Sequence, residues 1–96
     1  MSVIKKHKSK NCTIMSNYHL KDKNLSLEAV GLLSMLLLFS DNSEINETEM
    51  YKYLKEKPDF VNNVLSELEE SGYLFRKQLF QNGKFSGIEY HILDKN

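Results

Sequence analysis

The residues from Leu65 to Ile92, LSELEESGYLFRKQLFQNGKFSGIEYHI, decide the expected fold of this chain. They begin with the apolar spacing of a helix, reach Gly72, and continue as two stretches in which apolar and polar residues alternate. Gly72 suits the position just after a helix, where the backbone turns left-handed. Asn82-Gly83 separates the two alternating stretches and is the strongest short signal for a hairpin turn. The segment therefore predicts a helix that ends near Ser71, followed by strands over about 73–80 and 85–93.

The helix before this hairpin is expected over about residues 59–71. Pro58 suits the first turn of a helix, and Asp59 can cap it. Its inner face is apolar at helical spacing and comprises Phe60, Val61, Val64, Leu65 and Leu68.

Three earlier elements complete the expected order. Ser26 is a good N-cap for a helix that runs to about Phe39, and a second helix is expected from about Asn46 to Glu56. Residues 12–20, CTIMSNYHL, are rich in strand-forming residues and predict a strand. The chain has 96 residues, which is enough for one core. We therefore expect a single α+β domain over residues 12–96, preceded by a flexible basic arm over residues 1–11.

This order of strand, three helices and hairpin resembles a winged helix-turn-helix domain. The strings NYHLKDKNLSLEAVGLLSMLL (17–37) and LSELEESGYLFRKQLFQNGKFSGIEYHI (65–92) resemble small winged-helix modules of phage and plasmid proteins from low-GC Gram-positive bacteria. These modules include replisome-organiser proteins related to the DnaD N-terminal domain, and the TcpK-like accessory proteins of clostridial conjugative plasmids, which act at the transfer origin. The resemblance covers about residues 12–93. It implies binding of double-stranded DNA at an origin, with homodimers or tandem binding on repeated sites and with relaxosome or replisome proteins as possible partners.

The charges of the chain cancel overall, with 13 basic and 13 acidic residues, but they are unevenly placed. Residues 1–24 sum to +5, residues 25–72 to −7 and residues 73–96 to +2. An asymmetry of this kind indicates a polyanionic partner for the two basic ends.

Two basic segments are the candidate contacts with DNA, which we expect to be AT-rich. The arm can follow phosphates or enter a minor groove, and the hairpin is thin enough to enter a minor groove as well. The candidate residues of the arm are Lys5, Lys6, Lys8 and Lys10, and those of the hairpin are Arg76, Lys77, Gln78, Asn82, Gly83, Lys84 and Ser86.

The last helix offers fewer contacts than is usual for such a domain. Residues 58–71 contain no Lys or Arg and four acids, Asp59, Glu67, Glu69 and Glu70. A helix with this charge is repelled by the phosphates that line a major groove. Side chains that could pair with base edges, asparagine preferring adenine, are Asn62, Asn63 and Ser66.

Each of these features also has a simpler interpretation. A lysine-rich terminus is often a solvated tail, and charges on a hairpin can serve only to prevent pairing with other strand edges. Asn62 and Asn63 are ordinary residues for a helix surface, and Phe80 and Phe85 can pack across the strand pair rather than bind a partner. The acidic middle of the chain leaves open a protein-binding module or a DNA-mimicking inhibitor, and a transcriptional repressor is a third alternative.

The sequence gives little indication of catalysis or of a cofactor. The histidines, His7, His19 and His91, are scattered without the spacing of metal ligands, and the chain has no glycine loop for phosphates. Cys12 and His19 are a conceivable nucleophilic pair, but the sequence supplies no evident third group. A single cysteine and the lack of an apolar leader predict a cytoplasmic protein. The lack of catalytic motifs predicts a non-enzymatic one.

Overall fold

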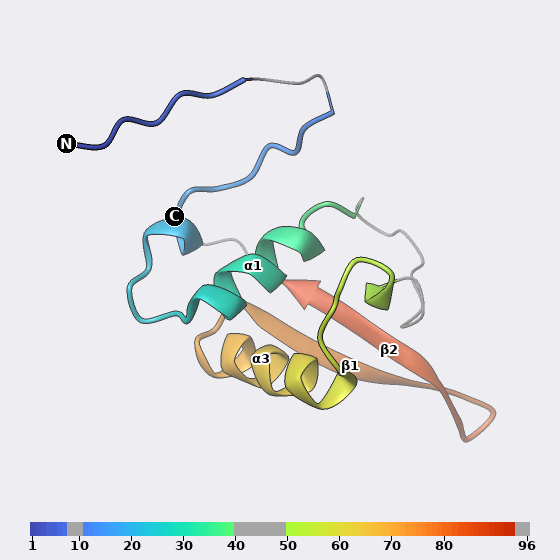
Figure 1. Ribbon diagram of the computed structural model, residues 1–96. Coiled ribbons are helices and arrows are strands. Elements are labelled where there is room, and N and C mark those ends of the chain that lie inside the picture. Colours follow the sequence, from blue (N-terminus) through green and yellow to red (C-terminus); the bar gives the residue numbers. More distant parts are fainter. Residues whose placement is uncertain (8–10, 40–49, 94–96) are drawn as a thin grey trace.

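The computed structural model describes residues 1–7, 11–39 and 50–93. A short 3-10 helix, η1 (His19–Lys21), leads into helix α1 (Leu27–Leu36). Helix α3 (Pro58–Glu70) follows, and strands β1 (Leu74–Gln81) and β2 (Lys84–Ile92) form an antiparallel two-stranded sheet. Figure 1 shows α1 and α3 stacked beside the hairpin, whose turn projects beyond both helices. The prediction of an α+β chain is confirmed.

The predicted helix starts and the hairpin are confirmed, with small shifts. Ser26 is the N-cap of α1, and its side-chain oxygen accepts a hydrogen bond from the backbone N–H of Ala29 at 3.1 Å. Helix α3 begins at Pro58, one residue earlier than expected, so Asp59 lies in its first turn and does not cap it. Gly72 follows the helix with a φ of 80°, which glycine adopts without steric cost.

The predicted strand over residues 12–20 is wrong. Residues 11–18 contain no helix or strand, and residues 19–21 form η1. A strand requires a neighbouring strand to pair with, and the described sheet contains only β1 and β2. Ile14, which the alternating pattern would place on a buried face, is 97% exposed. The residues of this segment favour a strand, but no described strand lies beside the segment to pair with it.

The predicted second helix, from Asn46 to Glu56, falls mostly where the chain is not described or not helical. Residues 46–49 lie outside the described residues. Met50 and Tyr51 are helical, and 3-10-type bonds follow, in which the N–H of Tyr53 donates to Met50 O and that of Leu54 to Tyr51 O. The helix does not extend to Glu56.

The core lies between α1, α3 and the start of the hairpin. Its buried side chains contribute the apolar area that stabilises the fold, at about 25 cal/mol for each Å² removed from water. They are Leu25, Ala29, Leu32, Leu33, Leu36, Met50, Val61, Val64, Leu65, Leu68, Tyr73 and Leu74.

Tyr73 joins the core to the segment before α1. Its side chain is 2% exposed, and its hydroxyl donates to Asp22 Oδ2 at 2.7 Å. Burial and this carboxylate raise the pKa of Tyr73, so its hydroxyl remains a hydrogen-bond donor at physiological pH.

Glu67 connects α3 to the start of α1. Its carboxylate accepts hydrogen bonds from the Ser26 backbone N–H at 2.8 Å and from the Ser26 hydroxyl at 2.6 Å. These bonds lower the pKa of Glu67 because they stabilise the ionised carboxylate. The Ser26 hydroxyl thus donates to one helix while its lone pair caps the other.

Replacing Glu67 with Gln is expected to destabilise the protein by about 1 kcal/mol at pH 7, because charge-assisted hydrogen bonds become neutral ones. Since the folded pKa of Glu67 lies below the ordinary glutamate value of 4.5, the full loss is expected above about pH 4.5. It disappears as the pH falls from there through the folded pKa. Urea denaturation of the wild type and of Glu67→Gln at pH 7, 5 and 3 measures this difference.

Glu70→Gln is the matched control, because Glu70 lies on the same helix and is exposed. It should change the free energy of unfolding by a few tenths of a kcal/mol at most. If Glu70→Gln costs as much as Glu67→Gln, or if the Glu67→Gln loss does not diminish between pH 5 and pH 3, the link to Ser26 does not have the role described.

Candidate nucleic-acid interface

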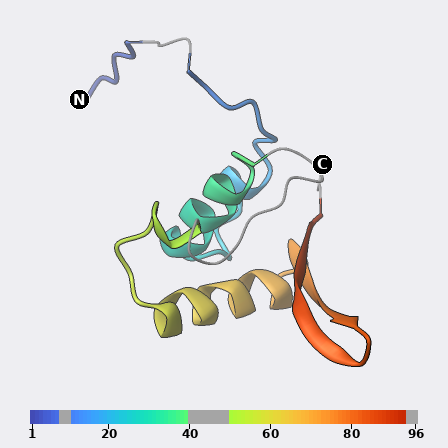
Figure 2. The same ribbon diagram turned by 90° about the vertical axis from the view of Figure 1, so that its right-hand side faces the viewer.

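The hairpin turn has the geometry that its sequence predicts. Asn82 has a φ of 52° and Gly83 a φ of 77°, the two positive values of a type I′ turn. This turn matches the right-handed twist of the flanking strands, so the strands stay paired up to Gln81 and Lys84. The tip is therefore narrow, and in Figures 1 and 2 it lies clear of the helices.

The three basic residues of the hairpin do not share one surface. Arg76 pairs across the sheet with Tyr90 and faces α3. Lys77 lies on the opposite face, directly across from Glu89, and is exposed. Lys84 is exposed beside the turn. The three cations of the hairpin therefore lie in different places: Arg76 faces α3, whereas Lys77 and Lys84 are exposed to solvent.

Arg76 is held by α3. Its Nε donates to Glu69 Oε1 at 2.9 Å, and its Nη2 contacts the same oxygen in an ion pair. Its Nη1 donates to the side-chain carbonyl of Asn62 at 2.7 Å. Arg76 therefore fixes the hairpin against the helix, and much of its charge is offset by Glu69. The sequence did not indicate this role for Arg76, although Asn62 and Glu69 are two helical turns apart and so share one face of α3.

The outward face of α3 is less acidic than its composition indicates. Glu67 turns toward Ser26, and Glu69 pairs with Arg76. The acids that remain on the exposed side are Asp59 and Glu70. Asn62, Asn63 and Ser66, the residues expected to pair with bases, lie on or beside this exposed side. They differ in whether their polar groups are free to bond to a base.

Asn63 is exposed, whereas the carbonyl of Asn62 is occupied by Arg76. The Ser66 hydroxyl donates to the backbone carbonyl of Asn62 at 3.1 Å, the usual bond of a helical serine to the preceding turn. The remaining hairpin candidates, Gln78, Asn82, Gly83 and Ser86, are exposed.

The N-terminal candidates are only partly described. Lys5 and Lys6 are exposed on an extended segment that runs away from the folded body in Figure 1. Lys8 and Lys10 lie outside the described residues.

The face of the hairpin turned away from α3 carries a stacked aromatic pair and a hydrogen bond to one of its rings. Phe75 stacks on the His91 ring, with centroids 4.4 Å apart and planes 6° apart. His91 Nε2 lies 2.5 Å from Glu89 Oε1. Glu89 therefore lies between two basic groups, His91 beside it and Lys77 across the strand.

The histidine that the chain buries has a structural partner. His19 Nε2 lies 2.9 Å from the Ser34 hydroxyl, and that hydroxyl donates its proton to Val30 O at 2.8 Å. Nε2 must therefore carry the proton of this hydrogen bond. Cys12 is exposed and no cluster of potential metal ligands occurs among the described residues. The conceivable pair of Cys12 and His19 thus has its histidine hydrogen-bonded into α1.

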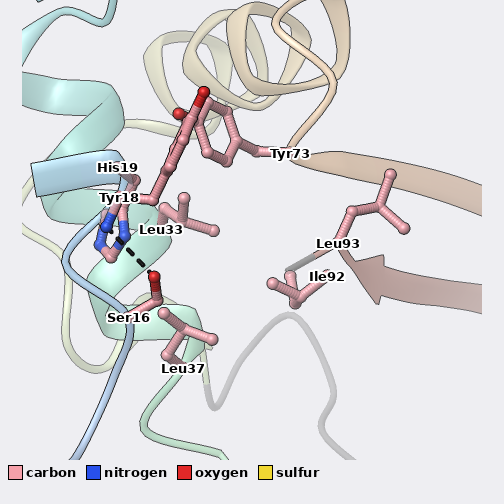
Figure 3. A pocket seen from close by; sticks show the side chains of 8 residues that line it. All are labelled: Ser16, Tyr18, His19, Leu33, Leu37, Tyr73, Ile92 and Leu93. Carbon is pink, nitrogen blue, oxygen red and sulfur yellow. Dashed lines mark hydrogen bonds between the residues drawn. The ribbon is translucent and has the colours of Figure 1, made fainter. Parts of the chain in front are cut away.

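A small cavity lies beside His19, shown in Figure 3. Its volume of about 10 Å³ is at the lower limit for one water molecule. The Tyr18 N–H donates to the Ser16 hydroxyl at its edge, and the Tyr18 and Tyr73 rings lie 6.3 Å apart. This place is a packing junction and is too small for a ligand.

A larger groove lies between α1, the start of α3 and the preceding segment. Its volume is about 240 Å³, and its wall is mostly apolar, including Leu32, Val61 and Phe60. Two carboxylates, Glu28 and Glu56, also line it. Phe60 was expected on the inner face of α3, but it is exposed and lines this groove.

Comparison with known proteins finds no matching family model, no matching curated protein and no matching solved structure. No described helix is long and apolar enough to cross a membrane.

The Arg76–Glu69 ion pair should be measurable in a double-mutant cycle. Arg76→Ala and Glu69→Gln should show a coupling energy of about 0.5–1 kcal/mol, the range for a partly exposed pair. The free energies of unfolding of the two single variants and the double variant give this value.

Lys77→Ala combined with Glu69→Gln is the control, because Lys77 lies on the opposite face of the sheet. Its coupling energy should be close to zero. Equal coupling energies in the two cycles would show that any positive charge on the hairpin interacts with Glu69 to the same extent. The Arg76–Glu69 ion pair would then have no specific role.

Proposed function

We propose that this chain is a non-catalytic double-stranded DNA-binding protein of a mobile element, acting at an origin of conjugative transfer or of replication. The hairpin and the N-terminal arm make the principal contacts in this proposal. A winged helix-turn-helix arrangement, with the hairpin as its wing, is part of the same proposal. The origin and the mobile element come from the resemblance of the sequence to phage and plasmid modules.

The charge of the hairpin and its position in the fold support it as the surface that contacts DNA. From Phe75 to Ile88 the chain has three basic residues and no acid, and the tip of this hairpin lies clear of the helices (Figure 1). Lys77 and Lys84 are exposed, and no ion pair is recorded for either in the described part of the chain. A cation that is free of internal partners can neutralise a phosphate without breaking a bond within the protein.

The sequence indicates Arg76 as a DNA contact, but in this proposal it has a structural role. Because it is bonded to Glu69 and Asn62, it would have to leave both to reach DNA. We assign it the task of holding the hairpin at a fixed angle to α3. The arm adds Lys5 and Lys6, with Lys8 and Lys10 continuing the basic run.

Helix α3 lies beside the groove in this proposal and does not enter it deeply. Asp59 and Glu70 remain on its exposed side and no basic residue offsets them within the helix. Asn63 is the best placed of its polar residues to contact a base edge. A transcriptional repressor would use the same contacts, and the neighbouring genes would separate transfer, replication and transcription.

The acidic groove favours a protein-binding module as the second candidate function. Its apolar wall and the carboxylates of Glu28 and Glu56 suit a basic peptide segment that carries an apolar anchor. A module of this kind would leave duplex DNA unbound even at low salt.

Removing two hairpin lysines should reduce the salt dependence of DNA binding. For Lys77→Ala/Lys84→Ala we expect the slope of log Kd against log salt concentration to fall by about 1.8, because each phosphate contact contributes about 0.9. Lys5→Ala/Lys6→Ala should act similarly. Fluorescence anisotropy with an AT-rich duplex at several salt concentrations measures these slopes.

Lys52→Ala/Lys55→Ala is the charge-matched control, since both lysines are exposed and lie outside the hairpin and the arm. It should leave the slope nearly unchanged. Equal effects of the hairpin and control variants would contradict the proposed interface. Failure of the wild type to bind duplex DNA at low salt would contradict the function itself.

A further inference from the structure

Two phenylalanines at the hairpin tip are largely exposed. Phe80 is 62% exposed and Phe85 58% exposed, and they flank the turn on its two strands. In the part of the chain that the structure describes, no element covers the tip (Figure 2). Two large apolar side chains in water are unfavourable for the free protein, which points to a partner that buries them.

A β-bulge places the two rings on the same face of the hairpin. Leu79 pairs with Gly87 and Phe80 pairs with Phe85, so Ser86 is an extra residue on β2. Without it, strict alternation would put Phe85 on the opposite face, with Glu89 and His91.

With the bulge, the Phe80 and Phe85 rings meet edge to face, with centroids 6.3 Å apart and planes at 77°. A bulge that re-aims a side chain at the end of a strand often accompanies a functional surface. Here it gathers two aromatic rings into one apolar unit beside the turn.

The residues around this pair select a polyanion as the partner. Lys84 adjoins Phe85, and the polar groups of Gln81 and Asn82 lie next to it at the turn. No acid occurs between Phe75 and Ile88. An apolar edge with a cation beside it complements DNA, whose stacked bases are apolar and whose backbone is anionic.

We propose that Phe80 and Phe85 form a wedge, which the hairpin inserts between two base pairs and which kinks the duplex. This inference rests on the proposed function, because it requires the hairpin to contact DNA. Lys84 would neutralise a phosphate beside the inserted rings. Pyrimidine–purine steps such as TA unstack most easily, so the wedge would favour AT-rich DNA that contains such a step.

The test compares bending by the wild type and by Phe80→Thr/Phe85→Thr. Threonine keeps the strand preference of the two positions and removes the rings. Energy transfer between dyes at the two ends of a duplex with a central TA step reports bending. We expect the wild type to shorten the end-to-end distance. The double variant should bind about tenfold more weakly, with the same salt slope, and should leave the duplex straight.

Phe75→Thr is the matched control, because Phe75 is also an exposed aromatic residue of the hairpin but lies on the opposite face. It should bend DNA as the wild type does. Circular dichroism and the unfolding midpoint check that each variant is folded.

A second readout uses the wild type alone. 2-Aminopurine placed at the TA step should become more fluorescent on binding, because unstacking relieves its quenching, whereas the same base within an A-tract should not change. This measurement does not depend on how the variants fold.

The outcomes separate the wedge from the proposed function. A wild type that binds DNA without bending it, or a double variant that still bends it, overturns the wedge and leaves DNA binding intact. A wild type that binds no duplex overturns both. Binding to anionic phosphatidylglycerol vesicles that depends on Phe80 and Phe85, with DNA bending unaffected by them, would assign the pair to a lipid surface and overturn the wedge.

Discussion

The buried ring of Tyr73 determines how the parts of this chain meet. Its hydroxyl donates to Asp22, which lies before α1, and its ring packs beside Tyr18. Its backbone N–H donates to Leu68 O at the end of α3, and its carbonyl accepts from the Leu93 N–H at the end of β2. One residue therefore joins the segment before α1 and the end of α3 to the base of the hairpin. Because the base of the hairpin is fixed there, its tip projects away from the helices.

The electrostatic character of the molecule follows from this geometry more than from its net charge of zero. The hairpin lies along α3 closely enough for Arg76 to reach Glu69 and Asn62. Glu67 faces the other way and bonds to Ser26. Two of the four acids of α3 thus stabilise contacts within the fold. Lys77 and Lys84 of the hairpin and Lys5 and Lys6 of the arm are exposed, and none of them is in an ion pair recorded for the described residues.

Local signals predicted the parts of the fold that depend on local interactions. The Asn82-Gly83 turn, the Ser26 cap and the end of α3 at Gly72 are confirmed, because each depends on backbone geometry within a few residues. The strand over residues 12–20 was wrong because a strand is defined by its partner, and no described strand pairs with that segment.

The candidate site was predicted less completely, because it too depends on contacts between residues far apart in the sequence. The sequence identifies Arg76 as a cation of the hairpin, but its partners lie 7 and 14 residues away on another element. Only the angle between α3 and the hairpin brings them together. Phe80 and Phe85 pack across the strand pair, as the sequence indicated. The bulge at Ser86, which interrupts the alternation along β2 between Ile88 and Phe85, has no unique sequence signal.

The most direct test of the hairpin as the DNA-contacting surface is an NMR titration of the ¹⁵N-labelled protein with an AT-rich duplex. The account predicts that the largest amide shifts occur at residues 77–86 and at Lys5 and Lys6, with small changes at Asn63 and Ser66 on α3. Shifts concentrated on α3 with an unperturbed hairpin, or no shifts at low salt, would contradict it.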